Sequence, residues 1–217
     1  MSADLFADAP RSTAHLPIVD GAHLLQAFID PAQARLLMQA IDTVLAQAPL
    51  RQMVTPGGFT MSVEMSNCGE LGWVTDRRGY RYQHQDPLSS QPWPAMPPLL
   101  ATLAAHAAQV AGFPGFVPDA CLINRYQAGA RMSLHQDKDE HDMTQPIVSV
   151  SLGLPATFLF GGAQRSDRAQ RLRLESGDVV VWGGPARLLF HGVAPLAAGE
   201  HALTGPYRYN LTLRRAR

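Results

Sequence analysis

Apolar residues recur at helical spacing in two separate parts of the chain. In residues 30–49, Asp30 can cap the N-terminus of a helix and Pro31 suits its first turn. The apolar face of this predicted helix consists of Leu37, Ile41, Val44 and Ala48. A second helix is predicted for residues 98–111, which follow Met-Pro-Pro and stop before Gly112. The stretch between the two helices contains Gly, Arg and aromatic residues and predicts hairpins with exposed aromatic side chains.

From residue 119 onward the pattern changes to short runs of β-prone residues. Turn signals such as AGA, ESGD and GGPA separate these runs at intervals typical of all-β domains. This spacing favours an antiparallel sandwich or barrel over strand–helix–strand units. We therefore predict a mainly β fold with flanking helices, of the α+β class.

Composition limits the classes of function. The chain has 217 residues, of which 46% are hydrophobic and 17% charged, so it can bury a sizeable core. Its formal net charge of zero gives no electrostatic case for bulk binding to nucleic acid or membranes, but it allows a local basic patch. The two cysteines, Cys68 and Cys121, form no CxxC motif. With no secretory signal and no long apolar run, we expect a reduced, cytoplasmic protein that does not contact membranes.

The run LHQDKDEHD concentrates candidate ligands beside a predicted strand. Residues two apart on a strand face the same side, so His135 and Asp137 can reach one ion. His191, on a later run, offers a third ligand. Two imidazoles and one carboxylate suit Fe(II) with open coordination positions. Considered alone, His135 and Asp137 also fit a surface loop, and His191 also fits a structural histidine. The remaining acids of the run, Glu140 and Asp142, are expected to be solvated.

The C-terminal run RYNLTLR separates polar and apolar residues with a period of two. Its polar face consists of Arg208, Asn210, Thr212 and Arg214. Two arginines on an inward face need an anion, because burying unpaired cations is costly. A guanidinium group binds carboxylates through two hydrogen bonds, so a small dicarboxylate beside the metal would satisfy both. A solvated edge strand is the alternative interpretation of this alternation.

These motifs together resemble the AlkB family of Fe(II)/2-oxoglutarate-dependent dioxygenases. The segments that carry the resemblance are RQMVTPGGFTMSV, PDACLINRY, LHQDKDE, IVSVSLGLPATFLFGG, GDVVVWGG and RYNLTLR. The family fold is a double-stranded β-helix, or jelly roll, with an N-terminal nucleotide-recognition lid. The resemblance divides the chain into a flexible leader (1–15), a helix with the lid hairpins (16–95) and the jelly-roll core (96–217).

The resemblance also implies roles for individual residues. The iron ligands, which carry the catalytic centre, are His135, Asp137 and His191. The positions that match 2-oxoglutarate-binding residues are Asn124, Tyr126, Arg208, Asn210 and Arg214. The positions that match substrate-binding residues are Thr55, Met65, Trp73, Tyr80, Tyr82, Asp139 and Arg165. Three further arginines of the lid are expected to contact phosphates, namely Arg77, Arg78 and Arg81.

The implied activity is direct reversal of base alkylation. The enzyme would use Fe(II), 2-oxoglutarate and O2 to demethylate 1-methyladenine or 3-methylcytosine, releasing formaldehyde, succinate and CO2. The expected partner is alkylated single-stranded DNA, with duplex DNA and RNA as alternatives, and the expected state is a monomer. Two other functions stay open: an oxygenase of the same fold that acts on RNA, protein or a small molecule, and a non-catalytic nucleic-acid-binding module.

Overall fold

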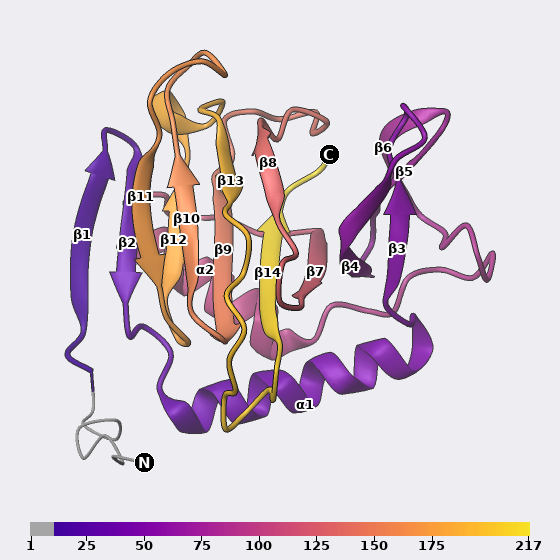
Figure 1. Cartoon of the computed structure of the whole chain (residues 1–217), viewed down its shortest axis with the longest axis horizontal. Coiled ribbons are helices and arrows are strands. Elements are labelled where there is room, and N and C mark those ends of the chain that lie inside the picture. Colours follow the sequence, from indigo (N-terminus) through magenta and orange to yellow (C-terminus); the bar gives the residue numbers. More distant parts are fainter. Residues whose placement is uncertain (1–10) are drawn as a thin grey trace.

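The computed structural model describes residues 11–217 as two helices and a set of antiparallel strands (Figure 1). The helices are α1 (Pro31–Gln47) and α2 (Pro98–Val110). The strands are β1 (Ala14–Val19), β2 (Ala22–Gln26), β3 (Arg51–Val54), β4 (Thr60–Gly69), β5 (Gly72–Asp76), β6 (Gly79–Gln83), β7 (Ala120–Tyr126), β8 (Met132–His135), β9 (Ile147–Gly153), β10 (Ala156–Phe160), β11 (Gln170–Leu174), β12 (Val179–Trp182), β13 (His191–Val193) and β14 (Arg208–Arg214). A short 3-10 helix spans Gly184–Ala186.

Both predicted helices are confirmed. The Asp30 side chain accepts a hydrogen bond from the Gln33 backbone N–H at 2.8 Å, and the Gln33 side chain returns one to the Asp30 N–H, which forms a capping box. Pro31 occupies the first turn, where its missing N–H costs nothing. The predicted apolar face of α1 is buried, with every side chain at most 2% exposed: Leu37, Ile41, Val44 and Ala48.

The strands form a large and a small sheet, which confirms the mainly β prediction and agrees with a jelly roll. The large sheet has eight strands in the order β1-β2-β12-β9-β14-β7-β4-β3, and the small sheet has four in the order β11-β10-β13-β8. Strands β5 and β6 pair only with each other, and we call residues 72–83 the lid hairpin. In Figure 1 this hairpin stands beside β3 and β4, at the opposite end from β1.

Each face of the large sheet contributes to a different core. One face packs against the helices, through residues such as Leu211 and Leu213 of β14 with Ile41 of α1 and Leu100 of α2. The second core lies between the sheets and includes Trp182. The polar side chains of β14 are also buried, so the solvated-edge interpretation of this strand is wrong.

The large sheet takes strands from both sides of the predicted boundary at residues 95 and 96. The division into lid and core units is therefore a proposal about function. The predicted leader falls mostly on residues 1–10, which lie outside the described residues, and β1 begins at Ala14. No helix in residues 11–217 combines the length and apolarity needed to cross a membrane.

Asp178 connects the N-terminal segment to the β11–β12 turn. Its fully buried carboxylate accepts hydrogen bonds from the Arg11 guanidinium and from the backbone N–H groups of Ala27 and Glu175. We expect Asp178→Ala to lower the free energy of unfolding by about 2–4 kcal/mol, because it leaves buried donors unpaired. Chemical denaturation measures this loss. Asp42→Ala, on the exposed side of α1, is the control and should change stability by less than about 0.5 kcal/mol.

Candidate active site

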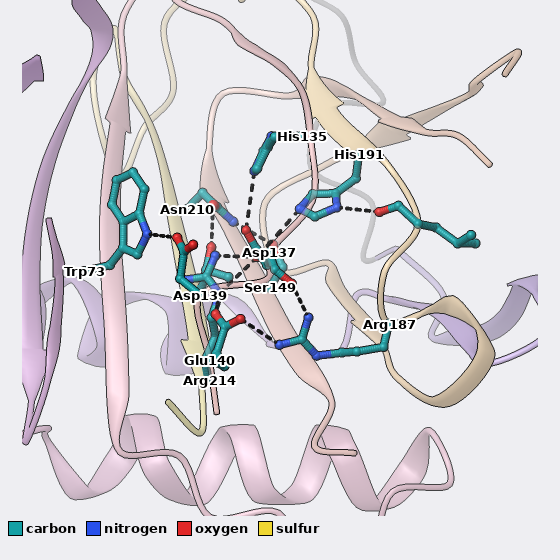
Figure 2. Close-up of polar contacts among 12 residues, drawn as sticks. Trp73, His135, Asp137, Asp139, Glu140, Ser149, Arg187, His191, Asn210 and Arg214 are labelled. Carbon is teal, nitrogen blue, oxygen red and sulfur yellow. Dashed lines mark hydrogen bonds and ion pairs between the residues drawn. The ribbon is translucent and has the colours of Figure 1, made fainter. Parts of the chain in front are cut away.

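Two histidines and one aspartate converge at the end of the small sheet (Figure 2). Their ligand atoms all lie within 4.8 Å of one another. The Nε2 atom of His135 lies 3.6 Å from one carboxylate oxygen of Asp137, and the Nε2 atom of His191 lies 3.7 Å from the other. The structure thus brings together the three residues that the sequence singled out.

Strand pairing places the two histidines side by side. His135 ends β8 and His191 begins β13, and the two are direct partners in the antiparallel register. Their ring centroids are 4.5 Å apart. Asp137 lies beyond the end of β8, so the expectation that it continues the strand is wrong. It nevertheless reaches the site, because it follows the strand by only two residues.

Backbone carbonyls determine which nitrogen of each ring faces the site. The Nδ1 atom of His135 lies 2.8 Å from the Ser133 carbonyl, and the Nδ1 atom of His191 lies 3.1 Å from the Leu189 carbonyl. A carbonyl can only accept, so each Nδ1 carries the hydrogen and each Nε2 keeps its lone pair. This arrangement holds both rings in the tautomer and orientation that a metal ligand needs.

The ionisation states also suit metal binding. About a third of the His135 side chain is exposed (36%), yet desolvation and repulsion from His191 lower its pKa to about 4. The ring is therefore neutral at pH 7. Burial opposes ionisation of Asp137, but the charge of Arg214 and contacts with both histidines hold its pKa well below the usual range. The site thus presents a neutral imidazole at His135 beside an ionised carboxylate at Asp137.

The polar face of β14 points into the space between the sheets. Arg214 donates two hydrogen bonds to Oδ2 of Asp137, the oxygen that faces His191, from Nε at 3.0 Å and from Nη2 at 2.6 Å. Arg208 lies at the other end of the strand and is 1% exposed. It stacks over the ring of Tyr126 at 5.0 Å and donates one hydrogen bond to the Ser151 hydroxyl.

Arg208 lacks the counter-charge that its burial requires. Its Nε and Nη1 atoms are buried and have no hydrogen-bond partner among the described residues, and burial lowers its pKa. The side-chain oxygen of Asn124 is likewise buried and unpaired within this part of the chain. A carboxylate would satisfy the free donors of Arg208 through two parallel bonds. The donor set therefore fits a small dicarboxylate beside the metal site.

The other predicted 2-oxoglutarate residues line a cavity beside the two histidines. Asn124, Tyr126 and Asn210 lie on its wall together with the two histidines and Arg214. Asn210 sits opposite Asn124 in the register of β14 and β7, and it donates to the Ser149 hydroxyl at 2.8 Å. A larger cleft of about 720 Å³ includes none of the predicted site residues. Chemistry, and not size, therefore locates the candidate site.

The lid hairpin places three aromatic residues near the metal ligands. Trp73 donates from its indole Nε1 to the Asp139 carboxylate at 2.8 Å, and its ring stacks on Tyr80 with centroids 5.6 Å apart (Figure 2). Tyr80 is 50% exposed, as predicted for a lid aromatic. Tyr82 differs, because its hydroxyl points inward and donates to Glu140 at 2.7 Å.

The remaining predicted substrate residues are more dispersed. Met65 is fully buried in β4 and pairs in register with Asn124 of β7. The hydroxyl of Thr55 accepts a hydrogen bond from the backbone N–H of Phe59 within the β3–β4 turn. Arg165 lies on the β10–β11 loop, with its guanidinium 5.4 Å from the centre of the Phe190 ring. No contact joins these three residues directly to the metal ligands.

The three lid arginines are not equivalent. Arg78 and Arg81 both donate to Asp76, at 3.0 and 2.8 Å, so their charges are partly neutralised inside the hairpin. These hydrogen bonds also hold the pKa of Asp76 far below its ordinary value. Arg77 has no ion pair with any residue in the described part of the chain. That all three contact phosphates stays a prediction, and Arg77 is the one of the three without a competing acid in the hairpin.

The sequence interpretation missed two residues of the site. Glu140 was expected to be solvated, but it is 6% exposed and lies between Arg187 and Arg214 (Figure 2). Arg187, 3% exposed, donates to the Asp137 backbone carbonyl at 2.7 Å. A buried arginine needs an acid, so the two arginines of β14 could have pointed to a second carboxylate in the HQDKDEHD run. No motif marks Arg187.

The site combines two imidazoles and one carboxylate with a buried arginine that has free donors, and it lies in a jelly roll. This combination is typical of a metal-dependent oxygenase that binds a dicarboxylate. Comparisons with known proteins agree. Residues 21–214 match the model of the 2OG-Fe(II) oxygenase superfamily. The "Alpha-ketoglutarate-dependent dioxygenase AlkB" of Salmonella typhimurium is 58% identical over 98% of this chain and 97% of its own length.

Two further comparisons are more distant. The "Nucleic acid dioxygenase ALKBH1" of Mus musculus is 36% identical over 57% of this chain and 31% of its own length. The solved structure of OsALKBH1 superposes with a TM-score of 0.83, at 27% identity, over 93% of this chain and 100% of that one. The chain belongs to the 2OG-Fe(II) oxygenase superfamily and, within it, to the AlkB dioxygenases. Its cofactors are accordingly Fe(II) and 2-oxoglutarate, for which the residues described above are suited.

Proposed function

We propose that this dioxygenase demethylates N-alkylated bases, such as 1-methyladenine and 3-methylcytosine, in nucleic acid. The observation that carries the proposal is the contact between Trp73 and Asp139. It places an aromatic surface and a carboxylate together, directly beside the metal ligands. Such a pair suits a flat, cationic ring that has been unstacked from its neighbours.

The residues of the core have separate tasks in this proposal. His135, Asp137 and His191 hold Fe(II), which with 2-oxoglutarate and O2 supplies the oxidation of the N-methyl group, yielding formaldehyde, succinate and CO2. Arg208 binds the distal carboxylate of 2-oxoglutarate, and Tyr126 supports its guanidinium by stacking. Asn210 assists Arg208 at the distal carboxylate, whereas Asn124 and Arg214 are proposed to lie near the end of 2-oxoglutarate that chelates iron. Arg214 also orients Asp137 by holding its Oδ2 atom.

The lid residues position the base and its backbone. The stacked rings of Trp73 and Tyr80 offer a platform for an extruded base, and Tyr82 anchors the hairpin from below. Thr55 and Met65 are proposed as further contacts of the substrate. Arg165 is proposed to lie near the target base, and Arg77, Arg78 and Arg81 of the lid hairpin are proposed to contact phosphates.

We propose that the substrate is single-stranded DNA in preference to duplex, because a base in a single strand is extruded at lower cost. RNA is a second candidate, since the mouse relative is named for nucleic acid in general. We also propose that the protein is a cytoplasmic monomer. Its chain is proposed to divide into a leader (1–15), a lid unit (16–95) and a core (96–217).

Mass spectrometry of a methylated oligonucleotide tests the activity. The enzyme is incubated with Fe(II), 2-oxoglutarate and ascorbate, and the single-stranded substrate carries one 1-methyladenine. We expect the oligonucleotide to lose about 14 mass units, which is the mass of one methylene group, and succinate to be released. Succinate release without demethylated product would favour an oxygenase that acts on a different substrate. Binding of the oligonucleotide without any succinate would favour the non-catalytic alternative.

Asp139 should discriminate lesions by charge. 1-Methyladenine is cationic near neutral pH, whereas 3-methylthymine is neutral. We expect Asp139→Ala to slow repair of the cationic base by about 10- to 100-fold and repair of the neutral base much less, by analogy with charged hydrogen bonds. Trp73→Ala should weaken both. Single-turnover demethylation of the two lesions in one sequence context gives the comparison, and equal losses with Asp139→Ala would refute charge recognition.

A further inference from the structure

Glu140 is a buried carboxylate with three partners from three different parts of the chain. It accepts hydrogen bonds from the Tyr82 hydroxyl at 2.7 Å and from Nη2 of Arg187 at 3.0 Å. It also lies 3.3 Å from Nε of Arg214. These partners come from the lid strand β6, the segment before β13 and the central strand β14. Glu140 therefore links the lid hairpin to the residues around the metal ligands.

Arg187 holds the backbone on which both acids lie. Its Nη1 donates to the carbonyl of Asp137 at 2.7 Å, and its Nε donates to the carbonyl of Gln145 at 2.9 Å. With its third contact on Glu140, one guanidinium fixes three points along residues 137–145. This segment lies outside the strands, so side-chain contacts such as these hold it in place. Arg187 thus limits the positions available to the Asp137 carboxylate.

Charge balance connects Glu140 to metal affinity. Arg187 and Arg214 are both buried, and Asp137 and Glu140 are the two carboxylates they contact. Without the charge of Glu140, Arg214 would have Asp137 as its only charged partner among these residues. A divalent cation would then approach a site with one additional positive charge, and the Asp137 carboxylate would be held more tightly by Arg214.

The lid connects to the same segment twice. Trp73 of β5 donates to Asp139, and Tyr82 of β6 donates to the neighbouring Glu140. A metal ion that fixes Asp137 also restrains the residues that follow it, because Arg187 ties them into one unit. The tyrosine hydroxyl then bonds to a better ordered acceptor, and β6 should open less often.

We propose that Glu140 is a positioning residue that couples the metal centre to the lid. Its charge keeps Asp137 available to the metal, and its hydrogen bond with Tyr82 transmits metal binding to β6. Arg187 supports both effects. The inference goes beyond the proposed substrate, because it concerns the protein without nucleic acid and can fail independently of the demethylation activity.

Three variants separate the two effects. Glu140→Gln removes the charge but keeps the shape and a group that can bond to Tyr82. Tyr82→Phe keeps every charge and removes only the hydroxyl, so it should fold normally. Asp142→Asn is the matched control, because it neutralises a carboxylate two residues away that bonds only within its own turn. Mn(II) replaces Fe(II) as the probe, and its affinity is measured by titration calorimetry with 2-oxoglutarate present.

The expected results differ for each variant. Glu140→Gln should raise the Kd for Mn(II) by about tenfold. In the parent, Mn(II) should slow hydrogen exchange in residues 79–83 by about fivefold, because the existing hydrogen bond from Tyr82 gains a better ordered acceptor. Tyr82→Phe should bind Mn(II) as the parent does but lose this slowing. Asp142→Asn should match the parent in both measurements.

Two outcomes would overturn the proposal. A folded Glu140→Gln variant that binds Mn(II) within twofold of the parent would show that the charge does not serve the metal. Tyr82→Phe variants whose residues 79–83 still respond fully to Mn(II) would show that the lid is not coupled through Glu140. Tyr82→Phe removes no charge, and Glu140 keeps both arginine partners, so the second result is available even if Glu140→Gln proves unstable.

Discussion

Each of the variants His135→Ala, Asp137→Ala and His191→Ala is expected to lose all measurable turnover while keeping its fold. Three ligands are the minimum set for an iron centre that must leave positions open, so removing one releases the metal or leaves it misplaced. The fold should survive, because both histidines lie at strand ends. In the aspartate variant, Arg214 retains Glu140 as a partner at 3.3 Å.

The control for these variants is His141→Ala. His141 is exposed and lies in the same loop, so its removal takes away an imidazole without touching the ligand set. Activity should be unchanged, and circular dichroism should be the same for all four proteins. Metal content after gel filtration distinguishes loss of iron from loss of chemistry. Full activity in any one of the three ligand variants would remove that residue from the metal site.

Arg208→Lys is expected to raise the concentration of 2-oxoglutarate needed for half-maximal rate by about 10- to 100-fold, which corresponds to the strength of one or two charge-assisted hydrogen bonds. Lysine keeps the positive charge but lacks the planar pair of donors that fits a carboxylate. The free Nε and Nη1 atoms of Arg208 are the donors concerned. Steady-state kinetics at saturating oligonucleotide measures the change.

A stability measurement gives an independent test of the same residue. A buried cation without a full set of partners costs free energy, so Arg208→Met should be no less stable than the parent when 2-oxoglutarate is absent. Adding metal and 2-oxoglutarate should raise the Tm of the parent more than that of the variant. Arg173→Lys, on an exposed stretch of β11, is the control for both experiments. An unchanged 2-oxoglutarate requirement in Arg208→Lys would mean that another residue binds the distal carboxylate.

Period-two alternation explains why so much of the site could be predicted from the sequence. In RYNLTLR it assigned Arg208 and Arg214 to one face and Leu211 and Leu213 to the other, and the structure confirms this division. A second local pattern, apolar residues at helical spacing behind a capping residue, predicted α1 correctly, because the cap and the apolar face lie within a single helix. Local geometry is set by neighbouring residues, and these are visible in the sequence.

Long-range pairing explains what was missed. Glu140 lies in a run of acids, which is the usual composition of a solvated loop, and only the arrival of Arg187 from 47 residues away buries it. The role of Tyr82 depends on the same carboxylate. Arg78 and Arg81 each bond to Asp76 inside the hairpin, a pairing that the sequence pattern did not reveal. In each case the partner, and not the residue type, decides the environment.

The position of β14 has a consequence for how the protein is made. This last strand in the sequence lies in the interior of the large sheet, where it pairs with β9 on one side and β7 on the other. During synthesis these two neighbours emerge first and have no strand between them. The large sheet, the helix-side core and the Arg214 contact with Asp137 can therefore form only after residue 214 has left the ribosome. Until then β7 and β9 present unpaired edges, so the nascent chain is exposed to aggregation until β14 emerges.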